Sequence, residues 1–310
     1  MNIKQEIENY IHCCKYQKKL NQKSIKAYSI DLKQFINYFD SHEQCLTKIG
    51  IRSYISMLHK TYSPKTVKRK LASIRAFFNY LEFEEILEIN PLRRIKTKFQ
   101  EPKVLPKVIS LEIIEQLLHA VHQEYEHAKT EYKKFVTLRD VAIIEALFAT
   151  GMRVSELCSL KVNDINLTNG SIHIMGKGGK ERIIQVGNEE VLSILSEYYR
   201  SNLVRIDQGD FFFVNRLSTR ISEQSVRFML QNFCAKADIS LKITPHMFRH
   251  SFATLLLEED VDIRYIQHML GHSSIQTTQI YTTVTTEKQR KILTTKHPRN
   301  KIMLKNEDCC

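Results

Sequence analysis

The segment 244–250 (TPHMFRH) combines a helix start with side chains that can bind an anion and move a proton. Thr244 and Pro245 are typical of the N-cap and the first position of a helix, and they place His246 in the first turn. Backbone N–H groups there favour an anion, and Arg249 projects from the same face three residues later. An imidazole beside a guanidinium fork could bind a phosphate. A surface histidine and arginine at a helix start would give the same local pattern.

Four residues elsewhere could complete such a site. Arg153 opens a second helix shortly after a glycine stop, and Glu156, three residues on, could orient it. Lys177 lies among glycines at the tip of a turn, where its ammonium group could donate a proton to DNA. His272 follows another glycine stop, and Tyr281 is a single phenol in a polar stretch. Taken singly, the lysine could serve only solubility and the phenol only packing.

The set as a whole indicates phosphoryl transfer through a tyrosine. The transition state carries negative charge on the non-bridging phosphate oxygens, and Arg153 and Arg249 could stabilise that charge. The Tyr281 phenol, with a solution pKa of about 10, needs nearby positive charge or a base before it can act as a nucleophile. A leaving 5′ oxygen must receive a proton, and histidine and lysine suit these proton transfers.

A metal site is the competing interpretation. His246 and His250 are four residues apart, and His268 and His272 repeat that interval, which lets two helical histidines share a metal. Such a site would indicate a hydrolase or a zinc protein. However, the segment lacks the glutamate of an HExxH motif, and Arg249 would oppose the charge of a metal. We therefore expect neither a metal nor another cofactor.

The elements that must position these residues are predicted to be mainly helices. In the N-terminal part, one helix is indicated by apolar residues at helical spacing, namely Tyr28, Leu32, Phe35, Ile36 and Phe39. A second helix begins at Ser63 and Pro64, and its apolar side consists of Leu71, Ile74, Phe77, Phe78 and Leu81. Its other side is basic and consists of Lys65, Lys68, Arg69, Lys70 and Arg75. Such a charge run is usually a solvated face, but in a basic protein it favours contact with phosphates.

The strongest β pattern is a hairpin. Residues 171–175 and 182–186 flank a glycine-rich turn at 176–180. A third strand could come from Leu167 or from residues 211–214. The remaining elements are predicted helices, one over 138–149 with a stop at Gly151, and others that start at Ser222, at Thr244 and near Asp262, with a stop at Gly271.

Three prolines interrupt the helical pattern between residues 91 and 106, so we place a domain boundary there. We expect one domain over residues 1–98, a linker over 99–106 and a second domain over 107–310.

The charge balance favours a polyanionic partner. The chain has 310 residues, a formal net charge of +12 and a pI near 9.3, which suit binding to a nucleic-acid backbone. No apolar run approaches the roughly 20 residues that span a membrane, and the first ten residues contain no signal-peptide core. The seven cysteines are odd in number and lack a repeated CxxC spacing, which argues against a disulfide framework. We expect a cytoplasmic protein that binds no membrane.

Four motifs together resemble the tyrosine recombinase, or phage integrase, family, and specifically its Xer-like members. They are TGMRVSEL at 150–157, GKGGKER at 176–182, TPHMFRHSFAT at 244–254 and LGHSSIQTTQIY at 270–281. The N-terminal stretches KSIKAYSIDLKQFINYF and SPKTVKRKLASIRAFF are similar to that family's core-binding domain. The resemblance spans most of the chain. It implies a mainly α fold, with an N-terminal helical core-binding domain and an α-rich catalytic domain that contains a small antiparallel β-sheet.

The resemblance also implies a role for each candidate residue. These roles are phosphate binding by Arg153, Arg249 and His272, proton transfer by His246 and Lys177, nucleophilic attack by Tyr281, and contact with DNA by Lys65, Lys68, Arg69 and Arg75. The intermediate would be a 3′-phosphotyrosyl bond that forms without metal or ATP. Strands of double-stranded DNA would be exchanged in a homo- or hetero-tetramer on paired sites, with or without a second recombinase. The reaction would resolve DNA dimers, or integrate and excise a mobile element.

Two other functions fit parts of the pattern. A non-catalytic DNA-binding regulator or architectural protein would use the basic faces, and Tyr281 would only pack. A type IB topoisomerase or a hairpin telomere resolvase would share the chemistry but would yield relaxed or hairpinned DNA. The tail at 301–310 has no role in any of these interpretations.

Overall fold

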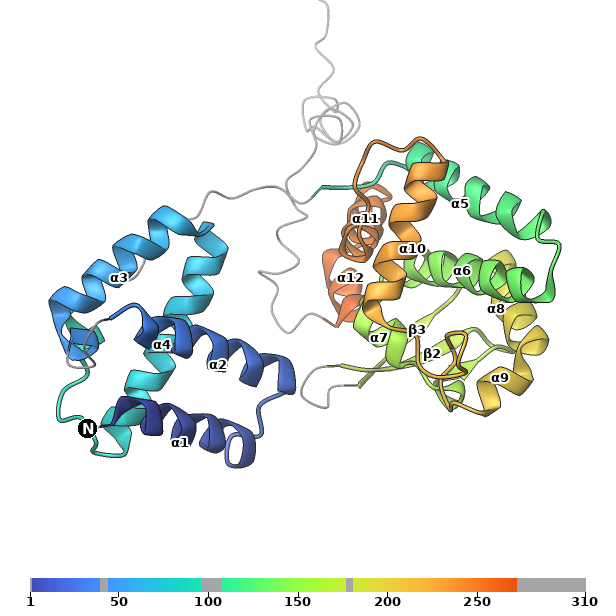
Figure 1. The fold of residues 1–310 in the computed structure, drawn as a ribbon. Coiled ribbons are helices and arrows are strands. Elements are labelled where there is room, and N and C mark those ends of the chain that lie inside the picture. Colours follow the sequence, from blue (N-terminus) through green and yellow to red (C-terminus); the bar gives the residue numbers. More distant parts are fainter. Residues whose placement is uncertain (1, 40–43, 96–106, 177–180, 272–310) are drawn as a thin grey trace, which may run out of the picture. The chain divides into compact units, whose positions relative to one another are not determined.

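The computed structural model describes residues 2–39, 44–95, 107–176 and 181–271 (Figure 1). The chain divides into two compact units, residues 1–104 and 105–310, and each has its own hydrophobic core. Three candidate catalytic residues, Lys177, His272 and Tyr281, lie outside the described residues.

The first unit consists of helices. They are α1 (Ile3–Tyr16), α2 (Gln22–Asn37), the 3-10 helix η1 (Gln44–Leu46), α3 (Lys48–Thr61), α4 (Pro64–Phe83) and the 3-10 helix η2 (Pro91–Arg94). As predicted, α4 begins directly after Ser63 with Pro64 at its first position, and the five apolar residues predicted for its inner face are all buried. On α2, Leu32, Phe35 and Ile36 are buried, while Tyr28 and, just beyond the helix end, Phe39 pack against the core from its edge. Helices α1, α2 and α3 all contact α4, which therefore forms the centre of this unit.

The second unit is also mainly helical. Its elements are α5 (Leu111–Glu126), α6 (Glu131–Thr150), α7 (Val154–Ser159), the 3-10 helix η3 (Val162–Asp164), β1 (Ile165–Asn166), β2 (Ser171–Met175), β3 (Glu181–Gln185), α8 (Glu189–Ser201), α9 (Leu203–Asp207), α10 (Glu223–Lys236), α11 (Pro245–Glu258) and α12 (Ile263–Leu270).

Helix α6 lies in the middle of the second unit (Figure 1). It packs against α5, α8 and α11, and its buried residues occur on all sides, as expected for a helix that forms a core. It starts seven residues before the predicted range because the Thr130 side chain caps it, accepting a hydrogen bond from the Lys133 backbone at 3.1 Å. The predicted starts at Ser222 and Asp262 are confirmed, since each of these residues is an N-cap whose side chain accepts a backbone hydrogen bond.

The three strands form one antiparallel sheet in the order β1-β2-β3. The predicted hairpin is present, and its register pairs Ile172 with Ile184 and Ile174 with Arg182. The prediction of the third strand was wrong, because Ile165–Asn166 supplies it, just before Leu167.

Residues 211–214 are not a strand of the sheet but make only isolated bridges through Phe211 and Val214. Phe212 and Phe213 are buried in the core, and the chain turns at once, with the Asn215 backbone bonded to Thr219 at 2.8 Å. An apolar run this short can therefore be core without being a strand. The predicted fold class, mainly α with a small antiparallel sheet, is confirmed.

Candidate active site

The corner between α6 and α7 is built around a glycine. Gly151 ends α6 in the left-handed conformation with φ of 58°, as predicted for a C-cap. A Cβ atom at this position would lie 2.7 Å from the Phe252 ring, so glycine is needed for space as well as for backbone conformation. Two residues later, Arg153 is the N-cap of α7. The glycine stop thus brings an arginine to a fixed backbone position.

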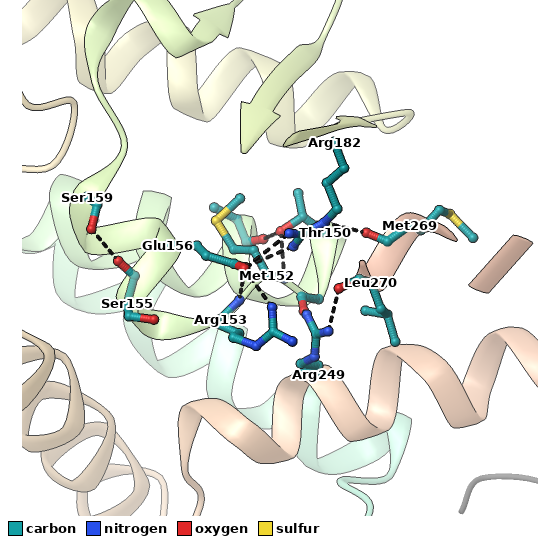
Figure 2. A network of polar contacts seen from close by, with 12 residues as sticks. Thr150, Met152, Arg153, Ser155, Glu156, Ser159, Arg182, Arg249, Met269 and Leu270 are labelled. Carbon is teal, nitrogen blue, oxygen red and sulfur yellow. Dashed lines mark hydrogen bonds and ion pairs between the residues drawn. The ribbon is translucent and has the colours of Figure 1, made fainter. Parts of the chain in front are cut away.

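Glu156 holds Arg153 in place, as the sequence predicted. One carboxylate oxygen, Oε2, accepts a hydrogen bond from the Arg153 backbone N–H at 2.8 Å, and the other, Oε1, accepts from Arg153 Nη1 at 2.7 Å (Figure 2). The side chain of Arg153 is still 36% exposed. Its Nη1 is therefore fixed by the protein while part of its guanidinium group stays accessible to an anion.

A second arginine, which the sequence motifs did not predict, binds the same carboxylate. Arg182 donates from Nη1 to Glu156 Oε1 at 3.1 Å and from Nη2 to Glu156 Oε2 at 2.8 Å, while its Nε donates to the backbone carbonyl of Met269 at 2.9 Å. The signal for it was present in the strand pattern. Arg182 shares the inward side of β3 with Ile184, and Val186 continues that side just beyond the strand, so a charged residue here requires a buried partner.

The electrostatics of this cluster keep Glu156 ionised. Burial by itself raises the pKa of Glu156, but hydrogen bonds from Arg182 and from the Arg153 backbone outweigh it and lower the pKa to about 2. Two guanidinium groups and one carboxylate leave the cluster with a net positive charge at neutral pH. The cluster therefore attracts an anion.

Arg249 lies on α11 and reaches the same corner. Its Nη1 donates to the Gly151 carbonyl at 3.0 Å and its Nη2 to the Leu270 carbonyl at 2.5 Å. Both carbonyls lie at helix C-termini, where the helix dipole favours a cation, and both helices are ended by left-handed glycines, Gly151 and Gly271. Arg249 is only 3% exposed, so a phosphate can reach it only if the groups that cover it move.

The histidines at the start of α11 differ in burial. Thr244 is the N-cap and Pro245 the first residue, as predicted, but the Thr244 side chain makes no capping hydrogen bond. His246 in the first turn is exposed, and its ring centroid lies 6.5 Å from that of His250. Burial, followed by the charges of His246 and Arg249, lowers the pKa of His250. These effects favour the neutral form of His250, whereas the exposed His246 is placed to meet a ligand.

The described residues thus bring together Arg153 and Arg249, with His246 on the helix that carries Arg249. Lys177, His272 and Tyr281 are outside the described residues, so their positions stay predictions. The possible metal site at His268 and His272 also stays untested, because His272 lies outside the described residues. Within the described ranges, no group of three or more His, Cys, Asp or Glu side chains could hold a metal ion.

The basic side of α4, the second candidate surface, differs from its prediction at one residue. Lys70 is buried, not exposed, because its Nζ lies 3.2 Å from Asp31 Oδ1 in the core and also bonds the Gln34 side chain. Arg69 pairs with the other oxygen of Asp31 but stays 46% exposed. The remaining basic residues of this side are exposed, namely Lys65, Lys68 and Arg75.

Two family models match the chain. Residues 107–288 match the phage integrase family, and residues 7–85 match the phage integrase N-terminal SAM-like domain. The chain belongs to the phage integrase family. The protein is a site-specific recombinase. None of the helices that the structure describes is long and apolar enough to cross a membrane.

Known relatives match nearly the whole chain, and they confirm the resemblance to Xer-like tyrosine recombinases. A tyrosine recombinase of Agathobacter rectalis is 50% identical, over 96% of this chain and 98% of the relative. The tyrosine recombinase XerD of Listeria innocua is 35% identical, over 94% of this chain and 98% of the relative. A crystal structure of XerA recombinase, 28% identical, has a TM-score of 0.54 over 97% of this chain and 99% of that one. The XerH recombinase bound to palindromic difH substrate has a TM-score of 0.74 at 24% identity, over 91% of this chain and 82% of that one, and shows the same fold.

Proposed function

We propose that this protein cuts and rejoins double-stranded DNA through a 3′-phosphotyrosyl bond to Tyr281. The observation that carries the proposal is the anchoring of two arginines at one corner. Arg249 bonds the carbonyl of Gly151, and Arg153 follows Gly151 by two residues on a backbone fixed by Glu156. Once the groups that cover Arg249 move aside, two guanidinium groups held at this corner can bind the two non-bridging oxygens of one phosphate and stabilise their charge in the transition state.

The proposed reaction moves one phosphate between two oxygens. The Tyr281 hydroxyl oxygen attacks phosphorus, and the bond from phosphorus to the 5′ oxygen breaks. His246 accepts the phenol proton, Lys177 gives a proton to the leaving 5′ oxygen so that it departs as a hydroxyl, and His272 assists the two arginines. The new bond keeps the energy of the broken one, so ligation is the reverse step and needs no ATP. Because guanidinium groups supply the positive charge, the reaction also needs no metal.

We assign DNA binding to both domains. Residues 1–98 form a core-binding domain, 99–106 a linker and 107–310 the catalytic domain. The basic side of α4 would contact the DNA backbone through Lys65, Lys68, Arg69 and Arg75 and would position the protein more than select a sequence. The XerH structures, solved with difH substrate, support DNA as the partner.

Exchange between two DNA sites requires two subunits on each site, so the active species would be a homo-tetramer, or a hetero-tetramer with a second recombinase. The orientation of the sites decides whether the product is a resolved DNA dimer or an integrated or excised mobile element. The chemistry at Tyr281 is the same in both cases.

The proposal is tested with two DNA molecules that carry the genomic sequence flanking the coding region of the protein. The full chain is incubated with them in EDTA and without ATP. The parent should exchange strands, Tyr281→Phe should bind but not exchange them, and Tyr265→Phe, which changes an exposed tyrosine of α12, should match the parent. Exchange by Tyr281→Phe would overturn the proposal in favour of other chemistry. Relaxed or hairpinned products would indicate a topoisomerase or a telomere resolvase.

A further inference from the structure

Arg182 is a buried cation on the inward side of a strand. Its side chain is 7% exposed, and the register of the hairpin places it opposite Ile174, which is buried. A buried charge costs several kcal/mol unless it is paired, and an apolar residue here would continue the core face of β3. The position of this arginine therefore calls for an explanation beyond packing.

The contacts of Arg182 join three separate elements. The strand β3 carries it, α7 contributes Glu156, and α12 contributes the Met269 carbonyl (Figure 2). Each of its three nitrogen atoms donates to a protein oxygen. Arg182 therefore links these three elements, and we assign it no direct contact with the phosphate.

The end of α12 is fitted closely to Arg182. A Cβ atom at Gly271 would lie 2.9 Å from Arg182 Cδ, and Gly271 has φ of 63°, so only glycine suits this turn. The neighbouring Leu270 carbonyl accepts from Arg249. Arg182 thus contacts Glu156, which holds Arg153. It also contacts the end of α12, where the Leu270 carbonyl holds Arg249.

Arg182 also determines the net charge of the cluster that a phosphate would approach. Without it, Glu156 would have Arg153 as its one guanidinium partner among the described residues, and the pair would be neutral. With it, the carboxylate is shared, since Oε1 accepts from both arginines. Arg153 then keeps more of its positive charge available for an anion.

We propose that Arg182 is a positioning residue for strand cleavage. It holds Glu156 and the end of α12 at a fixed separation. This fixes the distance between the Arg153 and Arg249 side chains so that both can bind one phosphate. This inference rests on the proposed function, in which both arginines bind the scissile phosphate.

The test uses the full chain and a nicked duplex that carries the flanking genomic sequence and traps the covalent adduct. Rate of adduct formation, DNA affinity and melting temperature are measured for the parent, Arg182→Met, Arg182→Lys and the double variant Arg182→Met/Glu156→Gln. Arg139→Met is the matched control, because Arg139 is also nearly buried and pairs with a buried carboxylate, Asp140, away from the corner. If the parent forms no adduct at Tyr281, the proposed function fails, and the role of Arg182 falls with it.

The inference predicts that Arg182→Met slows adduct formation by about 100-fold, comparable to the loss of one transition-state donor, while DNA affinity changes less than about 3-fold. Arg182→Lys, which keeps the charge, should recover part of the rate. The double variant should be no slower than Arg182→Met, because Arg182 acts through Glu156. Arg139→Met should lower the melting temperature but cleave as the parent does when both are folded.

Three results would overturn the inference. They are a parent-like rate in Arg182→Met, an equal loss of rate in Arg139→Met, and losses that multiply in the double variant. If Arg182→Met does not fold, Arg182→Lys decides the question. If both Arg182→Lys and Glu156→Gln form the adduct at the rate of the parent, the positioning role is also contradicted.

Discussion

Each unit of the molecule contains a buried carboxylate that two cations share, but the two clusters are connected differently. Asp31 accepts from Arg69, Lys70 and Ser73, whereas Glu156 accepts from Arg153 and Arg182. The partners of Asp31 all lie on α4, so that cluster fastens α2 to one neighbouring helix. The partners of Glu156 come from α7 and β3, and Arg182 continues to α12. The first arrangement stabilises packing, and the second connects the residue that holds Arg153 to the end of α12, whose Leu270 carbonyl accepts from Arg249.

The comparison teaches that a buried ion pair is not in itself evidence for a functional site. Lys70 is enclosed by its partners and also lies 4.9 Å from the Tyr62 ring centroid, so its charge is used within the fold. Arg153 is held by a carboxylate but keeps an accessible side. A cation that is fixed and still exposed is the more informative observation.

The largest expected effect is on stability and concerns Asp31→Ala. This change leaves Lys70 buried without its carboxylate, and we expect a loss of about 3–5 kcal/mol in the free energy of unfolding. Urea denaturation measures it. Glu131→Ala, which removes an exposed pair with Lys134, is the control and should cost less than about 1 kcal/mol. Equal losses in the two variants would show that the Asp31 cluster does not fasten α2 to α4.

The next effect is the acid sensitivity of Glu156. Its pKa falls from 4.5 to about 2 on folding, so the stability that it contributes is present above pH 4.5 and is lost as the pH falls toward 2. The contribution is on the order of 3 kcal/mol. The free energy of unfolding, measured against pH, should fall more steeply in the parent than in Glu156→Gln within this window. Parallel curves would mean that the arginines do not stabilise the ionised carboxylate.

Cleavage by Glu156→Gln separates the role of Glu156 in the site from its role in stability. The variant lacks the carboxylate charge that Arg153 and Arg182 share. We expect adduct formation to slow by about 100-fold with little change in DNA affinity. Glu124→Gln is the control, since Glu124 also binds two cations, Lys133 and Lys236, but lies away from the corner. A similar loss in both variants would point to general destabilisation.

The smallest effect concerns the basic side of α4. Lys65→Ala and Lys68→Ala should each weaken DNA binding a few-fold and reduce the slope of log affinity against log salt by about 1, because each removes one phosphate contact. Binding measured at several salt concentrations gives this slope. Lys134→Ala on α6 is the control and should leave the slope unchanged. An unchanged slope for the α4 variants would remove this helix from the DNA interface.

Features set by neighbouring residues could be predicted from the sequence. The glycine stops at Gly151 and Gly271, the caps at Ser222 and Asp262 and the contact of Arg153 with Glu156 all depend on residues within four positions of each other. The hairpin was predictable for the same reason, since alternation and a glycine-rich turn are local signals.

Features set by distant residues were missed. Lys70 is 39 positions from Asp31, and Arg182 is 26 positions from Glu156. Helical spacing alone cannot tell which lysine of a basic run turns inward when its partner lies on another helix. The prediction of the third strand was wrong for a similar reason. The strand that pairs with β2 is determined by the tertiary fold, and an apolar run such as 211–214 does not reveal it.

The central claim is that Tyr281 forms a covalent bond with DNA at the corner of Arg153 and Arg249. The most direct measurement is to incubate the protein in EDTA with the nicked duplex, denature the mixture, digest the adduct and map the peptide that carries DNA. We expect a denaturation-resistant adduct on the peptide that contains Tyr281, and none in Tyr281→Phe. DNA that is demonstrably bound and correctly positioned without any adduct, or an adduct on another residue, would contradict it.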